Sequence, residues 1–173
     1  KIIMKILTIV GARPQFIKAS TVSRRLKSAS IQETILHTGQ HYDEYMSDVF
    51  FKEMQLDKPK YFLDINNMSH GAMVGRMVES IEKTILNDPH DYILVYGDTN
   101  TTLSGALIAK KLNLKLIHIE AGLRSHNLDM QEEINRIITD RISDILFCPT
   151  ENAVNNLVSE GFYNYKCKII KCG

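Results

Sequence analysis

Residues 92–122 read YILVYGDTNTTLSGALIAKKLNLKLIHIEAG, and this stretch predicts a strand, a helix and a second strand in succession. Tyr92–Tyr96 and Lys115–Ile119 are short runs rich in Ile, Leu and Val, which is typical of buried strands. Thr101–Leu112 lies between them and has the length and composition of a helix. Two strands joined through a helix lie parallel in one sheet with a right-handed crossover, so this stretch predicts a parallel α/β sheet.

The same alternation of apolar strands and amphipathic helices continues on both sides of this unit. Further strands are expected at Ile2–Val10, in a run that ends at Ile35–His37, weakly at Tyr61–Leu63, at Ile145–Cys148 and at Lys168–Cys172. Further helices are expected at Gln15–Lys27, at Glu44–Met54, at Gly71–Leu86, at Glu132–Ile142, and in a segment capped by Thr150 and ended by Gly161. This order predicts a doubly wound, Rossmann-like parallel sheet, and residues 1–173 are expected to form one domain.

The bulk composition argues against several classes of protein. A net charge of +1 offers no strongly basic face, so neither nucleic acid nor a membrane surface is expected as a partner. No apolar run approaches the roughly 20 residues of a membrane span, and no signal-peptide cleavage site follows the first strand, so a cytoplasmic protein is expected. Neither a Gly-x-Gly-x-x-Gly motif nor a phosphate-binding Walker motif is present, so neither a dinucleotide cofactor nor ATP is expected.

Candidate chemistry is concentrated in loops that directly follow predicted strands, because ligands of open parallel sheets lie outside the carboxyl ends of the strands. Gly11 ends the first strand, where a small residue lets an anion approach free backbone N–H groups of the next helix. Arg13 offers a planar fork of donors for a phosphate or a carboxylate, and a purely structural ion pair is an equal alternative. Pro14 suits the first turn of the helix.

Two carboxylates follow two strands that are expected to be close in the sheet. Asp98 and Glu120 would converge if these strands are neighbours, as an acid and a base facing one cleft. As alternatives, Asp98 caps the following helix and Glu120 is an ordinary loop residue. Glu132 and Glu133 open a helix, where the helix dipole alone favours them. His118 shares the strand face of Glu120, but a hydrogen-bonded core histidine is favoured over a metal ligand, and no metal is expected.

Five motifs in this order resemble the non-hydrolysing UDP-N-acetylglucosamine 2-epimerases. They are Gly11-Ala12-Arg13-Pro14-Gln15-Phe16-Ile17-Lys18, Thr38-Gly39-Gln40-His41, Gly97-Asp98-Thr99, Glu120-Ala121-Gly122-Leu123-Arg124 and Glu132-Glu133-Ile134-Asn135-Arg136. The resemblance implies the N-terminal half of a GT-B arrangement, in which two Rossmann-like domains enclose the active site. It also implies that the C-terminal, UDP-binding domain lies outside these residues and that this domain alone is inactive.

The resemblance further implies a reaction and the residues that carry it. The family eliminates UDP across C1 and C2 of the sugar to leave a 2-acetamidoglucal and then adds UDP back after protonation on the other face, without a metal or nicotinamide cofactor. The implied catalytic residues are Asp98, Glu120 and Glu132. The implied substrate-binding residues are Gly11, Arg13, Lys18 and Arg136. Gln40 and His41 match part of an allosteric motif, and a homodimer is the implied assembly.

Alternative functions remain open at this point. The hydrolysing branch of the epimerases would release free ManNAc, and the stretch from Thr38 to Tyr42 also resembles relatives that act on other UDP-2-acetamido sugars. GT-B glycosyltransferases share the fold but bind their nucleotide mainly through the C-terminal domain and would not need the carboxylates. A nucleotide-sugar sensing domain would be expected to have lost them, yet Asp98 and Glu120 are both present.

Overall fold

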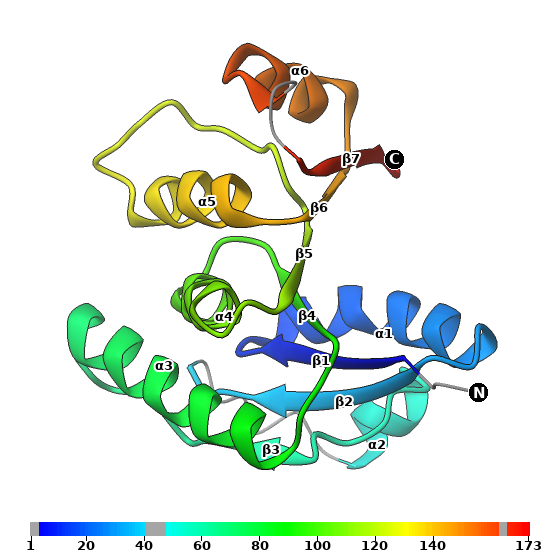
Figure 1. The fold of residues 1–173 in the computed structure, drawn as a ribbon. Coiled ribbons are helices and arrows are strands. Elements are labelled where there is room, and N and C mark those ends of the chain that lie inside the picture. Colours follow the sequence, from blue (N-terminus) through cyan, green and yellow to red (C-terminus); the bar gives the residue numbers. More distant parts are fainter. Residues whose placement is uncertain (1–3, 41–47, 163–165) are drawn as a thin grey trace.

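The computed structural model describes residues 4–40, 48–162 and 166–173. Within these residues, seven parallel strands form one sheet in the order β3-β2-β1-β4-β5-β6-β7 (Figure 1). The strands are β1 (Lys5–Val10), β2 (Gln32–His37), β3 (Tyr61–Phe62), β4 (Tyr92–Tyr96), β5 (Lys115–Ile119), β6 (Ile145–Cys148) and β7 (Lys168–Lys171). The helices are α1 (Arg13–Ser28), α2 (Asp48–Glu53), α3 (His70–Asn87), α4 (Asn100–Lys111), α5 (Gln131–Ile142) and α6 (Glu151–Ser159).

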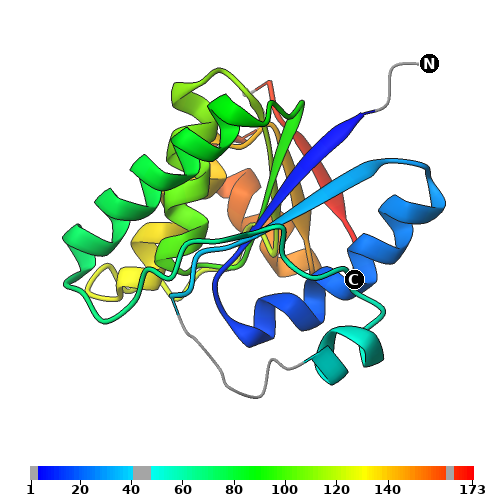
Figure 2. The same cartoon turned by 90° about the horizontal axis from the view of Figure 1, so that it is seen from below.

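Helices cover both faces of the sheet, which confirms the predicted doubly wound, Rossmann-like fold. Helices α1 and α2 lie on one face, and α3, α4, α5 and α6 lie on the other (Figures 1 and 2). Successive residues of a strand point to opposite faces. In β1, Leu7 and Ile9 therefore join the core under α3 and α4, whereas Ile6 and Val10 join the core under α1.

The neighbouring strands β1 and β4 form the switch point of the sheet. The chain leaves β1 toward α1 on one face and leaves β4 toward α4 on the other face. The two loops therefore diverge and open a crevice at the carboxyl ends of the strands, which is where open α/β sheets bind ligands.

Most predicted elements are confirmed to within a few residues. Thr150 caps α6, since its hydroxyl accepts the backbone N–H of Ala153 at 3.1 Å, and Gly161 follows the helix with a φ of +82°. The predicted strand from Ile2 begins at Lys5 in the structure, and the first three residues lie outside the described ones. Of the predicted helix Glu44–Met54, the described part is α2.

Helices α1, α3, α4 and α5 each begin one or two residues earlier than predicted. Helix α1 begins at Arg13 rather than Gln15, because Pro14 is accommodated in its first turn, and α4 begins at Asn100. The apolar stripe of α3 packs into the core as predicted; its buried residues are Met73, Met77, Ile81 and Ile85. Among the described helices, none combines the length and apolar character needed to cross a membrane.

Candidate active site

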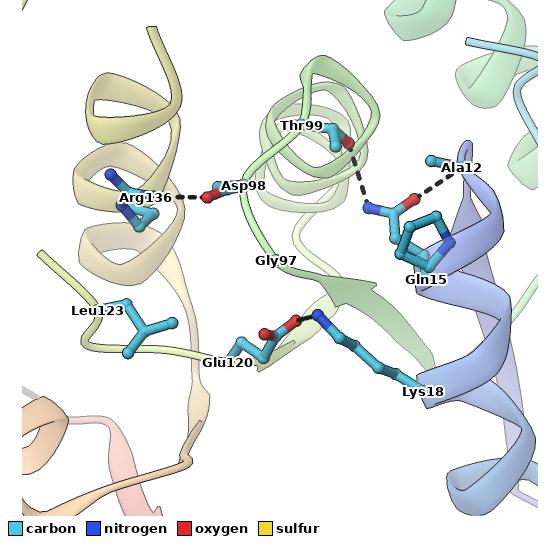
Figure 3. A pocket seen from close by; sticks show the side chains of 10 residues that line it. Ala12, Gln15, Lys18, Gly97, Asp98, Thr99, Glu120, Leu123 and Arg136 are labelled. Atoms are coloured by element: carbon cyan, nitrogen blue, oxygen red, sulfur yellow. Dashed lines mark hydrogen bonds and ion pairs between the residues drawn. The ribbon is translucent and has the colours of Figure 1, made fainter. Parts of the chain in front are cut away.

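A pocket of about 260 Å³ lies at the carboxyl ends of β1, β4 and β5 (Figure 3). Its walls come from the loops after these strands and from helices α1 and α5. The lining residues are Ala12, Pro14, Gln15, Lys18, Gly97, Asp98, Thr99, Glu120, Leu123 and Arg136. Four of the predicted site residues and their neighbours thus meet at the switch point of the sheet.

Asp98 and Glu120 come together because β4 and β5 are hydrogen-bonded neighbours. Tyr96 lies opposite Ile119 in the register of these strands, and the N–H of Gly97 donates to the carbonyl of Ile119 at 2.9 Å. Both carboxylates line the pocket, which confirms that the two strand ends converge. The two side chains point toward different walls of it (Figure 3).

Asp98 faces helix α5. Its Oδ2 lies 2.6 Å from Nη1 of Arg136, and its backbone carbonyl accepts a hydrogen bond from the side-chain amide of Asn135 at 2.8 Å. The alternative that Asp98 caps α4 is wrong, because the hydroxyl of Thr99 accepts the N–H of Thr102 and fills that position. The Asp98 carboxylate is therefore free of a capping role and is 35% exposed to the pocket side.

Glu120 faces helix α1 and has an unusual backbone conformation. Its Oε1 lies 2.6 Å from Nζ of Lys18. Its backbone φ of +72° lies in the left-handed region that residues other than glycine rarely adopt. Strained backbone of this kind persists only where the surrounding structure holds it, and it occurs often in active sites. Six other non-glycine residues among the described ones also have a positive φ, so the conformation alone does not decide between a functional role and that of an ordinary loop residue.

Gly11 was predicted to let an anion approach free N–H groups at the start of α1, but the N–H groups at this turn are bound by a side chain of the helix itself. The N–H of Gly11 donates to Oε1 of Gln15 at 2.7 Å, and the N–H of Ala12 donates to the same oxygen at 3.2 Å. The Nε2 of Gln15 donates in turn to the carbonyl of Tyr96 at 2.8 Å. Gln15 is 5% exposed, so this one side chain joins the end of β1 to the end of β4 inside the protein.

The small size of Gly11 serves packing instead of ligand approach. A Cβ atom at this position would come within 2.5 Å of the Thr38 hydroxyl and closer still to that of Thr101. The role of Gln15 was missed in the sequence, although a Gln at the third position of a helix is a recognised capping signal for the N–H groups before it.

Two adjacent glutamates at the start of α5 have different environments. Glu132 is exposed and is not among the residues that line the pocket. Glu133 is buried; its carboxylate accepts the N–H groups of Ser125 and His126 and lies 2.8 Å from Nη2 of Arg136. Burial raises the pKa of Glu133, but these backbone hydrogen bonds and Arg136 outweigh it and lower the pKa to about 2.

Arg136 is thus held between two carboxylates. It contacts Glu133 one turn earlier on α5 and Asp98 at the end of β4, and its side chain is 11% exposed. Glu133 was not among the predicted site residues, because the helix dipole was enough to explain a glutamate at the start of α5. The spacing of three residues between Glu133 and Arg136 is the signal that indicates their pairing.

The remaining predicted site residues lie outside the pocket lining. Arg13 is exposed at the first position of α1. Gln40 accepts the backbone N–H of Thr101 at 2.9 Å and its hydroxyl at 2.8 Å, so it caps the start of α4. His41 lies outside the described residues.

His118 is a core histidine, as favoured from the sequence. Its Nδ1 lies 2.7 Å from Oδ1 of Asp140, and its Nε2 lies 2.7 Å from the carbonyl oxygen of Gly97. Both ring nitrogens are therefore occupied, and neither is available to a metal ion. Across the part of the chain that the structure describes, no group of three or more His, Cys, Asp or Glu side chains is placed to hold a metal.

The arrangement combines acid–base groups with cations in one pocket. Asp98 and Glu120 can exchange protons with a bound molecule, and Lys18 and Arg136 can compensate negative charge. Comparison with known families then identifies the chain, because the family model described as UDP-N-acetylglucosamine 2-epimerase matches residues 24–173. The chain belongs to the UDP-N-acetylglucosamine 2-epimerase family.

Members of this epimerase family are similar over almost the whole chain. The UDP-2,3-diacetamido-2,3-dideoxy-D-glucuronate 2-epimerase of Pseudomonas aeruginosa is 56% identical over 171 residues, which are 98% of this chain and 48% of that protein. The UDP-N-acetylglucosamine 2-epimerase of Methanocaldococcus jannaschii is 48% identical over 167 residues. The chain spans about half the length of these epimerases.

Solved structures indicate the same family, and this chain again matches about half the length of its relative. The crystal structure of the Methanocaldococcus jannaschii epimerase in complex with UDP-GlcNAc and UDP superposes with a TM-score of 0.91 and covers 98% of this chain and 46% of that one. A lipopolysaccharide outer core galactosyltransferase shares the fold alone, with a TM-score of 0.64 at 14% identity. The fold is accordingly the N-terminal half of a GT-B arrangement, as predicted.

Proposed function

We propose that this chain supplies the carboxylate-bearing half of an enzyme that inverts C2 of a UDP-2-acetamido sugar by eliminating UDP and adding it back. The observation that carries the proposal is the pairing of Asp98 and Glu120 at neighbouring strand ends in one pocket, each beside a cation. Membership of the UDP-N-acetylglucosamine 2-epimerase family supports this choice over a glycosyltransferase, which would transfer the sugar without needing two carboxylates at C2.

The chemistry of this reaction matches the groups in the pocket. A carboxylate takes the proton from C2, the electron pair of that C–H bond forms the C1–C2 double bond, and the C1–O bond breaks with its electrons leaving on UDP. The products are a 2-acetamidoglucal and UDP. Re-addition of UDP at C1 and delivery of a proton to the opposite face of C2 complete the inversion, with no net change in atoms or electrons.

The cations have a role in the same steps. A departing diphosphate carries negative charge, and cations placed before the reaction stabilise such charge without having to reorganise. Lys18 is 47% exposed and can reach a phosphate oxygen while remaining beside Glu120. Glu132 is the third carboxylate of the proposal, and Arg13 is its further nucleotide-binding residue; both lie exposed next to the pocket-lining segments of α5 and α1.

We further propose that activity needs a C-terminal half of the kind that the relatives have. A volume of about 260 Å³ lies below the range of roughly 300–1,000 Å³ that is usual for pockets that bury a small ligand. In this proposal the pocket holds only part of the UDP-sugar, and the nucleotide needs a second wall. In the same proposal, the isolated chain is inactive and the complete enzyme is a cytoplasmic homodimer. Sedimentation of the complete protein tests the dimer.

Two sugars are candidates for the substrate. UDP-GlcNAc is bound in the structure of the Methanocaldococcus jannaschii relative, and the Pseudomonas aeruginosa relative, at 56% identity, is named for a 2,3-diacetamido glucuronate. Both are UDP-2-acetamido sugars, so the reaction at C2 is the same for both. They differ at C3 and C6, which makes a direct comparison of the two substrates informative.

The test is proton exchange at C2. The full-length protein, in which this chain is joined to its C-terminal half, is incubated in deuterated water with each UDP-sugar and followed by NMR. Deuterium at C2 in a mixture of two UDP-linked epimers is the expected result, and it is lost in a variant that carries both Asp98→Asn and Glu120→Gln. Release of a free sugar and UDP would indicate the hydrolysing branch, and the absence of exchange with both sugars would overturn the proposal.

A further inference from the structure

Asp140 is a buried carboxylate that the proposed reaction does not use directly. It lies on α5 with a fully buried side chain, away from the pocket lining, and it accepts hydrogen bonds from three groups. Its Oδ1 lies 2.7 Å from Nδ1 of His118, and its Oδ2 lies 3.0 Å from the N–H of Gly122 and 2.7 Å from Nη1 of Arg124. These donors belong to β5 and to the loop that follows it.

We propose that Asp140 is a positioning residue that holds, from behind the pocket, both backbone segments that carry Asp98 and Glu120. The inference rests on the proposed function for its consequence on turnover, but its structural part stands on the hydrogen bonds alone. One arm runs through His118 to Gly97, and the other runs directly to Gly122.

The first arm reaches the residue before Asp98. The carbonyl oxygen of Gly97 can only accept a hydrogen bond, so Nε2 of His118 must carry a hydrogen toward it. Nδ1 on the other side of the ring lies 2.7 Å from the Asp140 carboxylate. The ring of His118 therefore connects α5 to the end of β4 through both of its nitrogens.

The two arms together constrain Glu120 from both sides. His118 precedes Glu120 by two residues, Gly122 follows it by two residues, and both donate to Asp140. Between these anchors Glu120 adopts its left-handed φ of +72°. The two anchors therefore fix the backbone on both sides of Glu120 beside the pocket.

The charge of Asp140 is compensated within the same network. Arg124 contacts both Asp140 and Glu160, at 2.7 and 2.6 Å, and its side chain is 1% exposed. Burial raises the pKa of Asp140, but the hydrogen bond and charge of His118 together with Arg124 outweigh it and lower the pKa. An Asn at this position would have one acceptor oxygen for three donors, so it would leave at least one arm unsatisfied.

The chain offers a matched control in Asp144. This carboxylate also sits beside β5, but at its opposite end, where it accepts the N–H of Leu116 and pairs with Lys110 and Lys115, all at 2.9 Å. Asp144→Asn removes interactions of the same kind without touching the pocket, but in a more exposed place. Asp144→Asn is therefore expected to lower the melting temperature less than Asp140→Asn, and the positioning role is read from the segment-specific effects.

The experiment measures amide hydrogen exchange by mass spectrometry and turnover in the full-length protein. Asp140→Asn is expected to speed exchange at least tenfold in residues 97–99 and 120–124 and to lower kcat at least tenfold while KM stays within about threefold. Asp144→Asn is expected to leave both segments protected and kcat within twofold. His118→Asn keeps the donor to Asp140 but cannot reach Gly97, so it should loosen residues 97–99 and leave residues 120–124 protected.

The outcomes separate this inference from the proposed function. Unchanged exchange in both segments of Asp140→Asn, or an equal loss of kcat in Asp144→Asn, would overturn the positioning role. If the unmodified protein exchanges no proton with either UDP-sugar but the variants show the expected exchange patterns, the proposed function fails and Asp140 still positions the two segments. If Asp140→Asn does not fold, the segment-specific response of His118→Asn decides the question.

Discussion

The ammonium of Lys18 lies 2.6 Å from a carboxylate oxygen of Glu120, so α1 provides the positive partner of a residue 102 positions later, at the end of β5 (Figure 3). Lys18 is 47% exposed and Glu120 is 23% exposed. Solvent screens such a pair, and pairs of this kind contribute about 0–1 kcal/mol to stability. Its main consequence is therefore expected in the chemistry of the pocket rather than in the stability of the fold.

Glu120→Gln is expected to lower turnover of the full-length protein by roughly 10²–10⁴-fold, because an amide cannot take or give the proton at C2. The change removes one partly exposed ion pair, so the melting temperature should shift by less than about 4 °C. Steady-state kinetics and differential scanning calorimetry measure the two effects. Wild-type turnover in this variant would exclude Glu120 from the reaction.

Lys18→Met should lower kcat/KM by about tenfold or more, because the pocket loses a cation that can stabilise the leaving diphosphate. The free energy of unfolding should fall by less than about 1 kcal/mol. Lys83→Met is the matched control, since Lys83 forms an exposed pair with Glu79 on α3 at 2.8 Å. If both variants keep wild-type kinetics, Lys18 serves only as a surface partner of Glu120.

Gln15→Ala is expected to destabilise the protein by about 2–3 kcal/mol, because it leaves buried N–H groups of Gly11 and Ala12 without their acceptor. Urea unfolding followed by circular dichroism measures this loss. Gln32→Ala, at the exposed start of β2, should change the free energy of unfolding by less than about 0.5 kcal/mol. Equal effects of the two changes would show that Gln15 is not the link between β1 and β4.

Gly11→Ala and Gly75→Ala should have opposite effects on stability. A methyl group at Gly11 would meet the hydroxyls of Thr38 and Thr101, which are hydrogen-bonded to each other at 2.7 Å. It should lower the free energy of unfolding by about 1–3 kcal/mol. At Gly75, within α3, nothing lies within 4 Å of the new atom. Alanine there should add about 0.5–1 kcal/mol by favouring the helix. Thermal unfolding of both variants decides between packing and ligand approach as the reason for Gly11.

Glu133 is expected to make the free energy of unfolding depend on pH in the acid range. Its pKa falls from the ordinary 4.5 to about 2 in the folded state. A group whose pKa is lowered by folding stabilises the protein above its unfolded pKa, and this contribution disappears as the pH falls through the folded pKa. About 3 kcal/mol should therefore be lost between roughly pH 4.5 and 2.

Urea unfolding at a series of pH values measures this loss and its source. Glu133→Gln should be less stable than the unmodified protein at neutral pH and should lack this part of the acid dependence. The exposed neighbour Glu132 is the control, because Glu132→Gln should retain it. The same acid dependence in both variants would assign it to other carboxylates.

The strand and helix pattern could be predicted because it depends on local composition. Runs such as Tyr92–Tyr96 are short and apolar on both faces of the strand, and this is a property of consecutive residues alone. The position of the site could be predicted for the same reason, since Asp98 and Glu120 directly follow such runs. The family could be predicted because its motifs are also local.

The partners of the site residues could not be predicted in this way. Arg136 is 38 positions from Asp98, and which of the two Glu residues before it turns inward depends on the rotation of α5 by about 100° per residue. Gly11 was expected to let an anion approach free N–H groups at the start of α1, and instead Gln15 accepts the N–H groups of Gly11 and Ala12, because α1 begins early enough to bring this side chain back.

The sequence by itself determined the order of strands and helices, the parallel α/β class and the loops that line the candidate site, because these follow from short-range patterns of apolar and polar residues. Only the tertiary structure decided that Lys18 faces Glu120, that Arg136 faces Asp98 and that Asp140 lies behind both segments. These contacts depend on which strands are neighbours in the sheet and on how each helix is rotated against it. Both are settled by packing the whole chain around one core, which no short stretch of sequence specifies.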